Sequence, residues 1–123
     1  MSPAGEGGRI GLGFPKECRV GAGREIDRVF RSGARISRKG MALRALRREV
    51  QGPSRVVFAP VKSFRGSVER NRAKRLAREV WRLNRSRVAP GWDLAFVLYP
   101  DLDGFAAYSD SMLSLLGKAG LLR

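Results

Sequence analysis

The sequence predicts a single α+β domain in which helices pack against a small sheet. The expected elements follow one another as helix, strands, helix, strand and helix along 123 residues, a length that suits one domain. Hydrophobic residues make up 43% of the chain, which is enough to build a packed core. Because there is no long apolar stretch, we expect no signal peptide, no membrane-spanning helix and a cytoplasmic location.

The first part of the chain predicts an arm followed by a helix. Residues 1–13 are rich in glycine and lack periodicity, so we expect a flexible N-terminal arm before a single domain over 14–123. The segment 23–33 is expected to be a short helix that stops at Gly33. Its apolar residues recur at helical spacing: Ile26, Val29 and Phe30.

Three segments have the pattern of strands. Side chains alternate over 41–49, with Met41, Leu43 and Ala45 on one face. The segment 55–61 is a second strand, in which Pro60 indicates an end or an edge position because proline cannot donate to a ladder. The nearly continuous apolar segment 92–99 predicts a strand that is buried on both faces.

Two further helices are expected. The longest runs from Glu69 to about Arg87, with Ser67 as a candidate N-cap and a break at Pro90. The last helix is expected to begin at Ser109 or Asp110, either of which can cap it. Its apolar residues are Met112, Leu113, Leu115, Leu116 and Ala119.

The charge of the chain predicts a polyanionic partner. There are 25 Lys and Arg against 11 Asp and Glu, a formal net charge of +14, which favours nucleic acid over an acidic membrane surface. Residues 61–88 contain 10 basic and 2 acidic side chains, whereas 1–60 contain 13 and 5, and 89–123 contain 2 and 4. We therefore expect the partner surface to centre on 61–88. Arginine supplies most of the cations, which fits phosphate recognition and equally a GC-rich genome.

The composition excludes several kinds of chemistry. Histidine is absent, which rules out histidine acid–base catalysis, a Ser-His-Asp triad and a histidine-liganded metal. Cys18 is the single cysteine, so neither an internal disulfide nor a cysteine-rich zinc site is possible. Carboxylates that could hold a metal are few, and for Asp101, Asp103, Glu25 and Asp27 a turn or cap role is the favoured interpretation.

The long helix is predicted to carry one cationic face. On a helix of about 100° per residue, several polar residues lie within about 60° of Arg78: Asn71, Lys74, Arg75, Arg82 and Arg85. The opposite side is apolar and contains Ala73, Leu76, Val80 and Leu83. Glu69 and Glu79 lie off the cationic face, so its like charges repel one another unless phosphate groups neutralise them. A solvated basic face is the alternative interpretation.

Consecutive residues of this helix resemble the signature of a known family. They read R-N-R-A-K-R-L-A-R-E over residues 70–79, and the bacterial ribonuclease P protein component opens its helix with R-N-R-x-K-R-x-x-R. Flanking matches fall in register: Phe14-Pro15-Lys16 with Arg19, Glu25 to Phe30 with Ser32-Gly33, Arg55-Val56, and the basic loop from Lys62 to Val68. The resemblance extends over residues 14–118.

The resemblance implies a fold and a function. The family folds as an α-β-β-β-α-β-α two-layer sandwich similar to domain 2 of ribosomal protein S5, with a left-handed crossover through the long helix. Residues 34–49 would then supply two strands. In the family a large RNA subunit uses Mg²⁺ to remove the 5′ leader of precursor tRNA, and the protein binds both RNAs. No catalytic residue is therefore expected in this chain, and neither DNA nor a membrane is an expected partner.

The resemblance also assigns roles to individual residues. The signature residues expected to contact RNA are Arg70, Asn71, Arg72, Lys74, Arg75 and Arg78. The basic loop and the cationic face add Lys62, Arg65 and Arg82 as expected RNA-binding residues. Those expected to line a cleft for the leader are Arg19, Ile26, Phe30, Arg44 and Ala59. Phe30 is expected to stack on a base, with core packing as the alternative, whereas Phe64 is expected to pack, with stacking on a base as the alternative. A structural RNA-binding protein of ribosomal type and a DNA-binding domain are the other classes considered, and the absence of a helix-turn-helix setting disfavours DNA.

Overall fold

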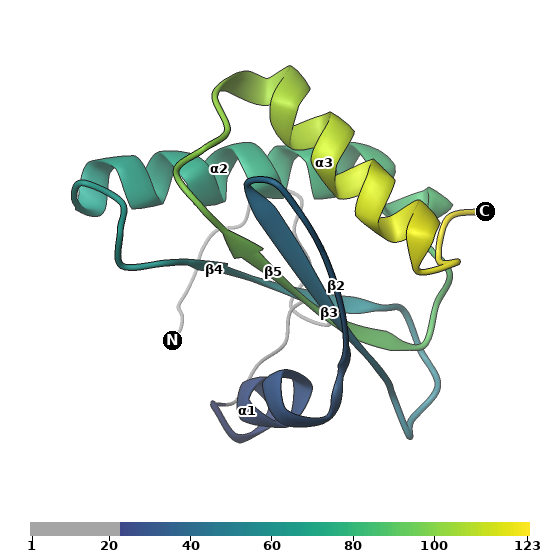
Figure 1. Cartoon of the computed structure of the whole chain (residues 1–123). Helices are drawn as coiled ribbons and strands as arrows, with labels where there is room; N and C mark the ends of the chain where they lie inside the picture. Colours follow the sequence, from purple (N-terminus) through teal and green to yellow (C-terminus); the bar gives the residue numbers. More distant parts are fainter. Residues whose placement is uncertain (1–22) are drawn as a thin grey trace.

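Four strands form one sheet in a computed structural model that describes residues 23–123 (Figure 1). The elements are α1 (Gly23–Ser32), β2 (Ala34–Arg38), β3 (Met41–Arg47), β4 (Arg55–Pro60), α2 (Ser67–Asn84), the 3₁₀ turn η2 (Arg85–Arg87), β5 (Trp92–Leu98) and α3 (Gly104–Lys118). Residues 34–49 supply β2 and β3, as expected. The flexible arm expected over 1–13 lies outside the described residues.

The strands lie in the order β2-β3-β5-β4. β2 and β3 form an antiparallel hairpin, and β3 pairs antiparallel with β5. β4 lies parallel to β5, and the chain crosses between them through α2. The interior position of β5 explains its apolar sequence, and Pro60 ends the edge strand β4, so both predictions are confirmed.

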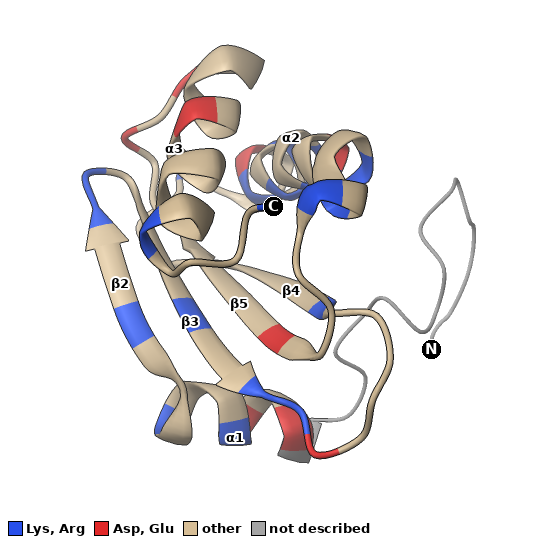
Figure 2. Ribbon diagram, turned by 90° about the vertical axis from the view of Figure 1, so that its right-hand side faces the viewer, with Lys and Arg blue, Asp and Glu red and all other residues tan. Residues whose placement is uncertain are grey.

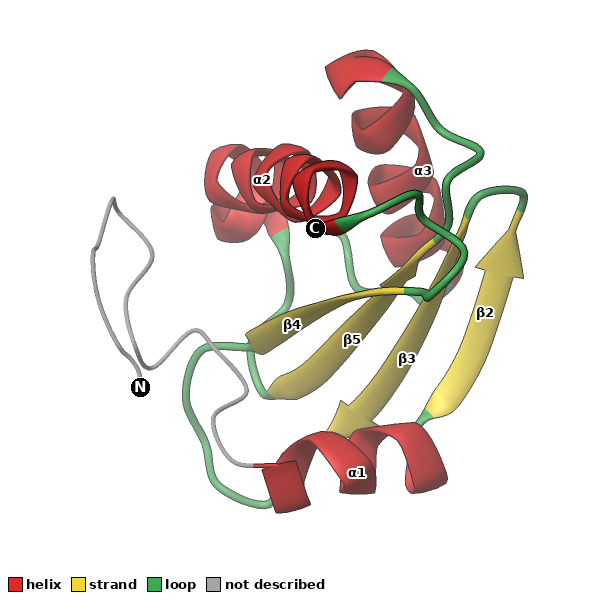
Figure 3. Ribbon diagram, turned by 90° about the vertical axis from the view of Figure 1, so that its left-hand side faces the viewer, coloured by secondary structure: helices red, strands yellow, loops and turns green. Residues whose placement is uncertain are grey.

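One face of the sheet, the core face, is covered by α2 and α3 (Figure 3). Alternate residues of each strand point to this face. The buried side chains of the strands include Met41, Leu43, Val56, Phe58, Leu94, Phe96 and Leu98. The helices add Val80, Trp81, Met112, Leu115 and Leu116. The rings of Phe58 and Phe96 stack with their centroids 5.8 Å apart, so two neighbouring strands are joined at the centre of the core.

The opposite face of the sheet, the α1 face, is covered by α1 at one end (Figure 3). Val29 is completely buried but is not part of the core cluster, which places it on this other side of the sheet. Gly33 ends α1, and a Cβ at this position would lie 2.5 Å from the carbonyl oxygen of Val29. The junction between α1 and β2 therefore requires glycine, in agreement with the predicted stop.

The long helix differs from its prediction in two respects. α2 begins at Ser67 itself, with Gly66 as N-cap and no side-chain cap hydrogen bond, so the expectation that Ser67 caps the helix is wrong. Leu83, expected on the buried side, is 54% exposed. The buried residues are Ala73, Ala77, Val80 and Trp81. On an α-helix with about 100° of rotation per residue, Leu83 points about 120° away from the buried Ala77 and therefore faces solvent.

The last helix begins earlier than predicted. α3 starts at Gly104, so Ser109 and Asp110 lie inside the helix rather than at its N-cap. The reason is that the buried stripe begins with Tyr108, one turn before Met112. Asp103 occupies the N-cap position in an extended conformation.

None of the helices within residues 23–123 is long and apolar enough to cross a membrane.

Candidate nucleic-acid interface

The cationic face of α2 consists of Asn71, Lys74, Arg75, Arg78, Arg82 and Arg85. Four of these side chains are exposed, and Lys74 and Arg85 are half-buried at its border. This face lies opposite the buried stripe that runs through Ala77. Because the core fixes which side of α2 is buried, the cations must point away from the sheet. Figure 2 shows basic residues recurring along α2.

The cationic face is partly compensated, contrary to the prediction. Arg82 donates from Nε to Glu79 Oε1 at 3.0 Å and also forms an ion pair with that carboxylate one turn away. This hydrogen bond raises the pKa of Arg82 and lowers the pKa of Glu79. In contrast, the ion pairs among residues 23–123 include neither Lys74 nor Arg75. The charges of Lys74 and Arg75 are therefore available to an anion.

The beginning of α2 adds further positive charge. Lys62 and Arg65 are at least partly exposed in the loop before the helix, whereas Phe64 between them is 8% exposed and belongs to the core. The packing role expected for Phe64 is thus confirmed. No side chain caps the helix, so the backbone N–H groups of its first turn can attract phosphate.

Arg70 and Arg72 lie apart from the exposed cations of the α2 face. Arg70 is half-buried, and its backbone N–H donates to the carbonyl of Gly66 at 3.0 Å. Arg72 points to the α3 side of the helix, where its Nη1 lies 3.6 Å from Asp103 Oδ1. The predicted RNA-binding residues therefore occupy two flanks of α2. Around the axis of an α-helix, Arg72 and Arg78 point in directions about 120° apart.

Four of the five residues expected to line the leader cleft lie on the same side of the sheet. On α1, Ile26 and Phe30 are at least partly accessible, and Val29 is the residue that packs fully. Arg44 is paired with Ala95, and the strand register places Ala59 on this face as well. Arg44 Nη1 lies 3.5 Å from the carbonyl oxygen of Gly33, where a cation is favoured at the C-terminal end of α1. The fifth residue, Arg19, lies outside the described residues.

A buried ion network attaches α1 to this face. Asp93 is 6% exposed and accepts two hydrogen bonds from Arg55, at 2.8 Å and 2.9 Å. Arg55 also reaches Glu25 of α1 at 3.4 Å, and Arg48 lies 3.8 Å from Asp93. The hydrogen bond to Asp93 raises the pKa of Arg55. This network was not predicted from the sequence, although an acidic residue inside the apolar segment 92–99 is a signal that a buried cation must lie nearby.

The described carboxylates do not form a metal site of their own. Within residues 23–123, no three His, Cys, Asp or Glu side chains gather closely enough to hold a metal ion. Arginine side chains instead pair with Glu25, Glu49, Glu79, Asp93 and Asp103. These five carboxylates therefore already have cationic partners within the described residues.

Comparison with known proteins agrees with this geometry. The sequence model of the family described as Ribonuclease P matches residues 14–120. The chain is 31% identical over 102 residues to the ribonuclease P protein component of Pelotomaculum thermopropionicum, covering 81% of this chain and 90% of that protein. It is 33% identical over 100 residues to the protein of the same name from Desulfotalea psychrophila, covering 81% and 80%.

Solved structures share the fold. A Staphylococcus aureus RNase P protein mutant with defective mRNA degradation activity superposes with a TM-score of 0.79 at 17% identity, over 87% of this chain and 92% of that one. The RNase P protein from Thermotoga maritima gives 0.73 at 21% identity, over 81% and 96%. The expected α+β fold is thereby confirmed. With the family model matched over most of its length, this chain belongs to the family of the bacterial ribonuclease P protein component.

Proposed function

We propose that this chain is the protein subunit of ribonuclease P and binds both the catalytic RNA subunit and the 5′ leader of precursor tRNA. The observation that carries the proposal is the cationic face of α2, which the core turns outward and on which Arg75 is exposed and has no acidic partner within residues 23–123. Such a face releases counterions when it meets a phosphate backbone. Family membership supports the assignment of that backbone to ribonuclease P RNA.

The α1 face suits the 5′ leader. Phe30 offers a half-buried ring that can stack on a base without sequence preference, and Arg44 offers a guanidinium that can pair with phosphate or stack. Ala59 is half-buried on β4, and its small side chain adds little bulk to this face. The two interfaces would therefore lie on different sides of the molecule, one on α2 and one beside α1.

In this proposal the chain positions RNA and does not itself cleave it. With no histidine in the chain, the acid–base groups of a histidine-dependent protein ribonuclease are absent. Hydrolysis of the leader would then belong to the RNA subunit with its Mg²⁺, and the holoenzyme would act as the endoribonuclease. The contribution of this chain is to hold substrate and RNA subunit in the reactive arrangement and to reduce the repulsion between their phosphates.

Reconstitution tests the proposal directly. The protein is mixed with a bacterial ribonuclease P RNA at low Mg²⁺, and leader removal from precursor tRNA is followed. We expect cleavage to be faster than with RNA alone. RNA binding without any stimulation of cleavage would instead indicate a structural RNA-binding protein of ribosomal type.

Two variants that each remove one positive charge test whether the cationic face of α2 binds RNA. Arg75→Ala removes an exposed cation from the cationic face, and Lys118→Ala removes one exposed cation from the end of α3. We expect Arg75→Ala to lower the slope of log affinity against log salt by up to about 1 unit, whereas Lys118→Ala leaves it unchanged. Equal slopes for both variants would show that the α2 face is merely solvated.

A further inference from the structure

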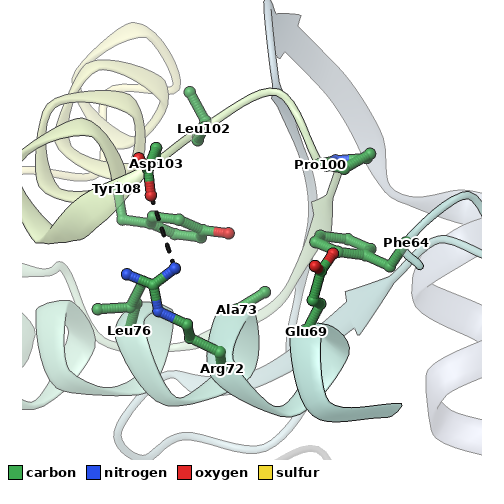
Figure 4. Close-up of a pocket in the computed structure, with 9 residues that line it drawn as sticks. All are labelled: Phe64, Glu69, Arg72, Ala73, Leu76, Pro100, Leu102, Asp103 and Tyr108. Atoms are coloured by element: carbon green, nitrogen blue, oxygen red, sulfur yellow. Dashed lines mark ion pairs between the residues drawn. The ribbon is translucent and has the colours of Figure 1, made fainter. Parts of the chain in front are cut away.

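A cavity lies on the other flank of α2, between α2, α3 and the loops that precede these two helices (Figure 4). Its volume is about 220 Å³. It is therefore smaller than the sites of drug-sized ligands, which occupy roughly 300–1,000 Å³. The side chains that line it include Phe64, Ala73, Leu76, Leu102 and Tyr108.

The walls and the rim of this cavity differ in character. The walls include the rings of Phe64 and Tyr108, which are buried, together with aliphatic side chains from α2. The rim is charged: Glu69 and the ion pair between Arg72 and Asp103 border it. The side chain of Arg72 is 57% exposed and that of Asp103 is 91% exposed, so both can reorient toward a ligand.

Tyr108 supplies the polar group inside. The residue is 2% exposed, and its hydroxyl points into the cavity (Figure 4). The hydrogen bonds among residues 23–123 include none made by this hydroxyl. In the described part of the chain Trp81 Nε1 is the buried side-chain atom without a hydrogen-bond partner, so the Tyr108 hydroxyl is open to solvent through the cavity and is available to a ligand there. Burial raises the pKa of Tyr108, which keeps the phenol protonated and able to donate.

We propose that this cavity binds a single unstacked nucleobase of the RNA partner, an inference that rests on the proposed function. A planar ring packs against the rings of Phe64 and Tyr108, while the Tyr108 hydroxyl bonds to an edge of the base. The carboxylates of Glu69 and Asp103 accept from an exocyclic amino group, which favours adenine, cytosine or guanine over uracil. Arg72 at the rim can pair with the adjoining phosphate.

The position of the cavity agrees with an RNA ligand. Phe64, which forms one wall, lies in the loop between the cations Lys62 and Arg65. A strand bound to these cations would therefore run past the loop that forms one wall of the cavity. RNA-binding proteins read single-stranded segments by splaying bases onto aromatic side chains in this way.

Two matched tyrosine variants test the inference in the complete complex. Tyr108→Phe removes only the hydroxyl and keeps the buried ring, whereas Tyr99→Phe removes the hydroxyl of the only other tyrosine, which does not line the cavity. We expect Tyr108→Phe to weaken binding of ribonuclease P RNA by about 3- to 10-fold, the value of one hydrogen bond. Tyr99→Phe is expected to leave the affinity unchanged, and thermal unfolding confirms that both variants fold.

A second measurement observes the cavity alone. AMP and UMP are titrated into the full chain while the amide signals of Ala73, Leu102 and Tyr108 are followed by NMR. We expect saturable shifts with AMP, weaker shifts with UMP, and a loss of the difference when Asp103 and Glu69 are replaced by Asn and Gln. If the attraction is purely electrostatic, removal of these carboxylates should instead strengthen the binding of AMP and of UMP equally.

The outcomes separate this inference from the proposed function. If the unmodified chain fails to bind ribonuclease P RNA, the proposed function fails. If it binds, but Tyr108→Phe and Tyr99→Phe bind equally well, only the nucleobase site is overturned. The absence of AMP shifts at the three amides also overturns it.

Discussion

On the core face of the sheet, α2 and α3 bury a continuous set of large apolar side chains around Phe96. On the α1 face lies a single helix of ten residues (Figures 2 and 3). It is held by Val29 and by an ion network that reaches Glu25. The side chains of the first face are almost entirely removed from water. On the second face Val29 and Asp93 are buried, but Phe30 and Arg44 remain half-buried.

This difference separates stability from binding. Apolar burial is non-directional and contributes most of the free energy of folding, and the side chains around Phe96 supply it on the core face. Half-buried aromatic and cationic side chains contribute less to folding, but they retain surface for a ligand. The centre of the core face therefore has the composition of a scaffold, whereas the accessible part of the α1 face has that of a binding surface.

Adjacent residues of β5 provide the sharpest test of this contrast. Phe96 points to the core face and Val97 to the α1 face, where it is half-buried. We expect Phe96→Ala to lower the free energy of unfolding by about 3–5 kcal/mol, because it leaves a cavity among Leu43, Phe58 and the helices. Val97→Ala is expected to cost less than about 1.5 kcal/mol. Urea unfolding of both variants measures the difference, and equal losses would contradict the comparison.

The ion network is the part of the α1 face that resembles a core. Asp93→Asn leaves the half-buried Arg55 and Arg48 without their carboxylate, and we expect a loss of about 3 kcal/mol in the free energy of unfolding. Glu25→Gln removes a partner whose side chain is 41% exposed, so water screens the pair and the expected loss is below about 1 kcal/mol. If the two substitutions cost the same, the network is not organised around Asp93.

Local patterns were sufficient to predict most of the fold. Alternation at Met41, Leu43 and Ala45 identified the buried side of β3, and the apolar segment 92–99 identified the interior strand. The start of α3 was predicted too late because Ser109 and Asp110 are residue types that often cap helices. The helix in fact begins at Gly104, after Asp103, and Gly104 has a φ of +84°. Local sequence does not indicate this conformation, because it depends on the path of the preceding loop. Tertiary packing outweighed local propensity there.

The candidate site was predictable only where it is local. The cationic face of α2 follows from helical spacing, but its compensation by Glu79 depends on which rotamers the two side chains adopt. Arg55 is 38 residues from Asp93 and 30 from Glu25, so no local pattern joins them. The cavity beside Tyr108 needs side chains from α2, α3 and two loops, and spacing along the chain cannot show that they meet.

A smaller effect is expected from Phe30. Phe30→Ala should weaken binding of precursor tRNA with its leader by about 1–3 kcal/mol, the value of one stacked base, and should weaken binding of mature tRNA less. Fluorescence binding to the reconstituted holoenzyme measures both substrates. An equal loss for the two RNAs, accompanied by a lower free energy of unfolding, would assign Phe30 to packing against the sheet and remove one aromatic from the binding surface.

The smallest effect on stability is expected from substitution of Glu79, on the outer side of α2. There the contrast between stability and binding can be tested at a single ion pair. The hydrogen bond from Arg82 lowers the pKa of Glu79 in the folded state. The pair therefore stabilises the fold at pH values above the ordinary pKa of 4.5. This stabilisation is lost as the pH falls through the lowered pKa. Glu79→Gln should therefore lower the melting temperature slightly at pH 7 and not at pH 2. The same substitution releases Arg82, so at pH 7 it should strengthen binding of ribonuclease P RNA and steepen the salt dependence. A variant that loses both stability and RNA affinity at pH 7 would show that the Glu79–Arg82 pair presents Arg82 to the RNA, and that here stability and binding depend on the same contact.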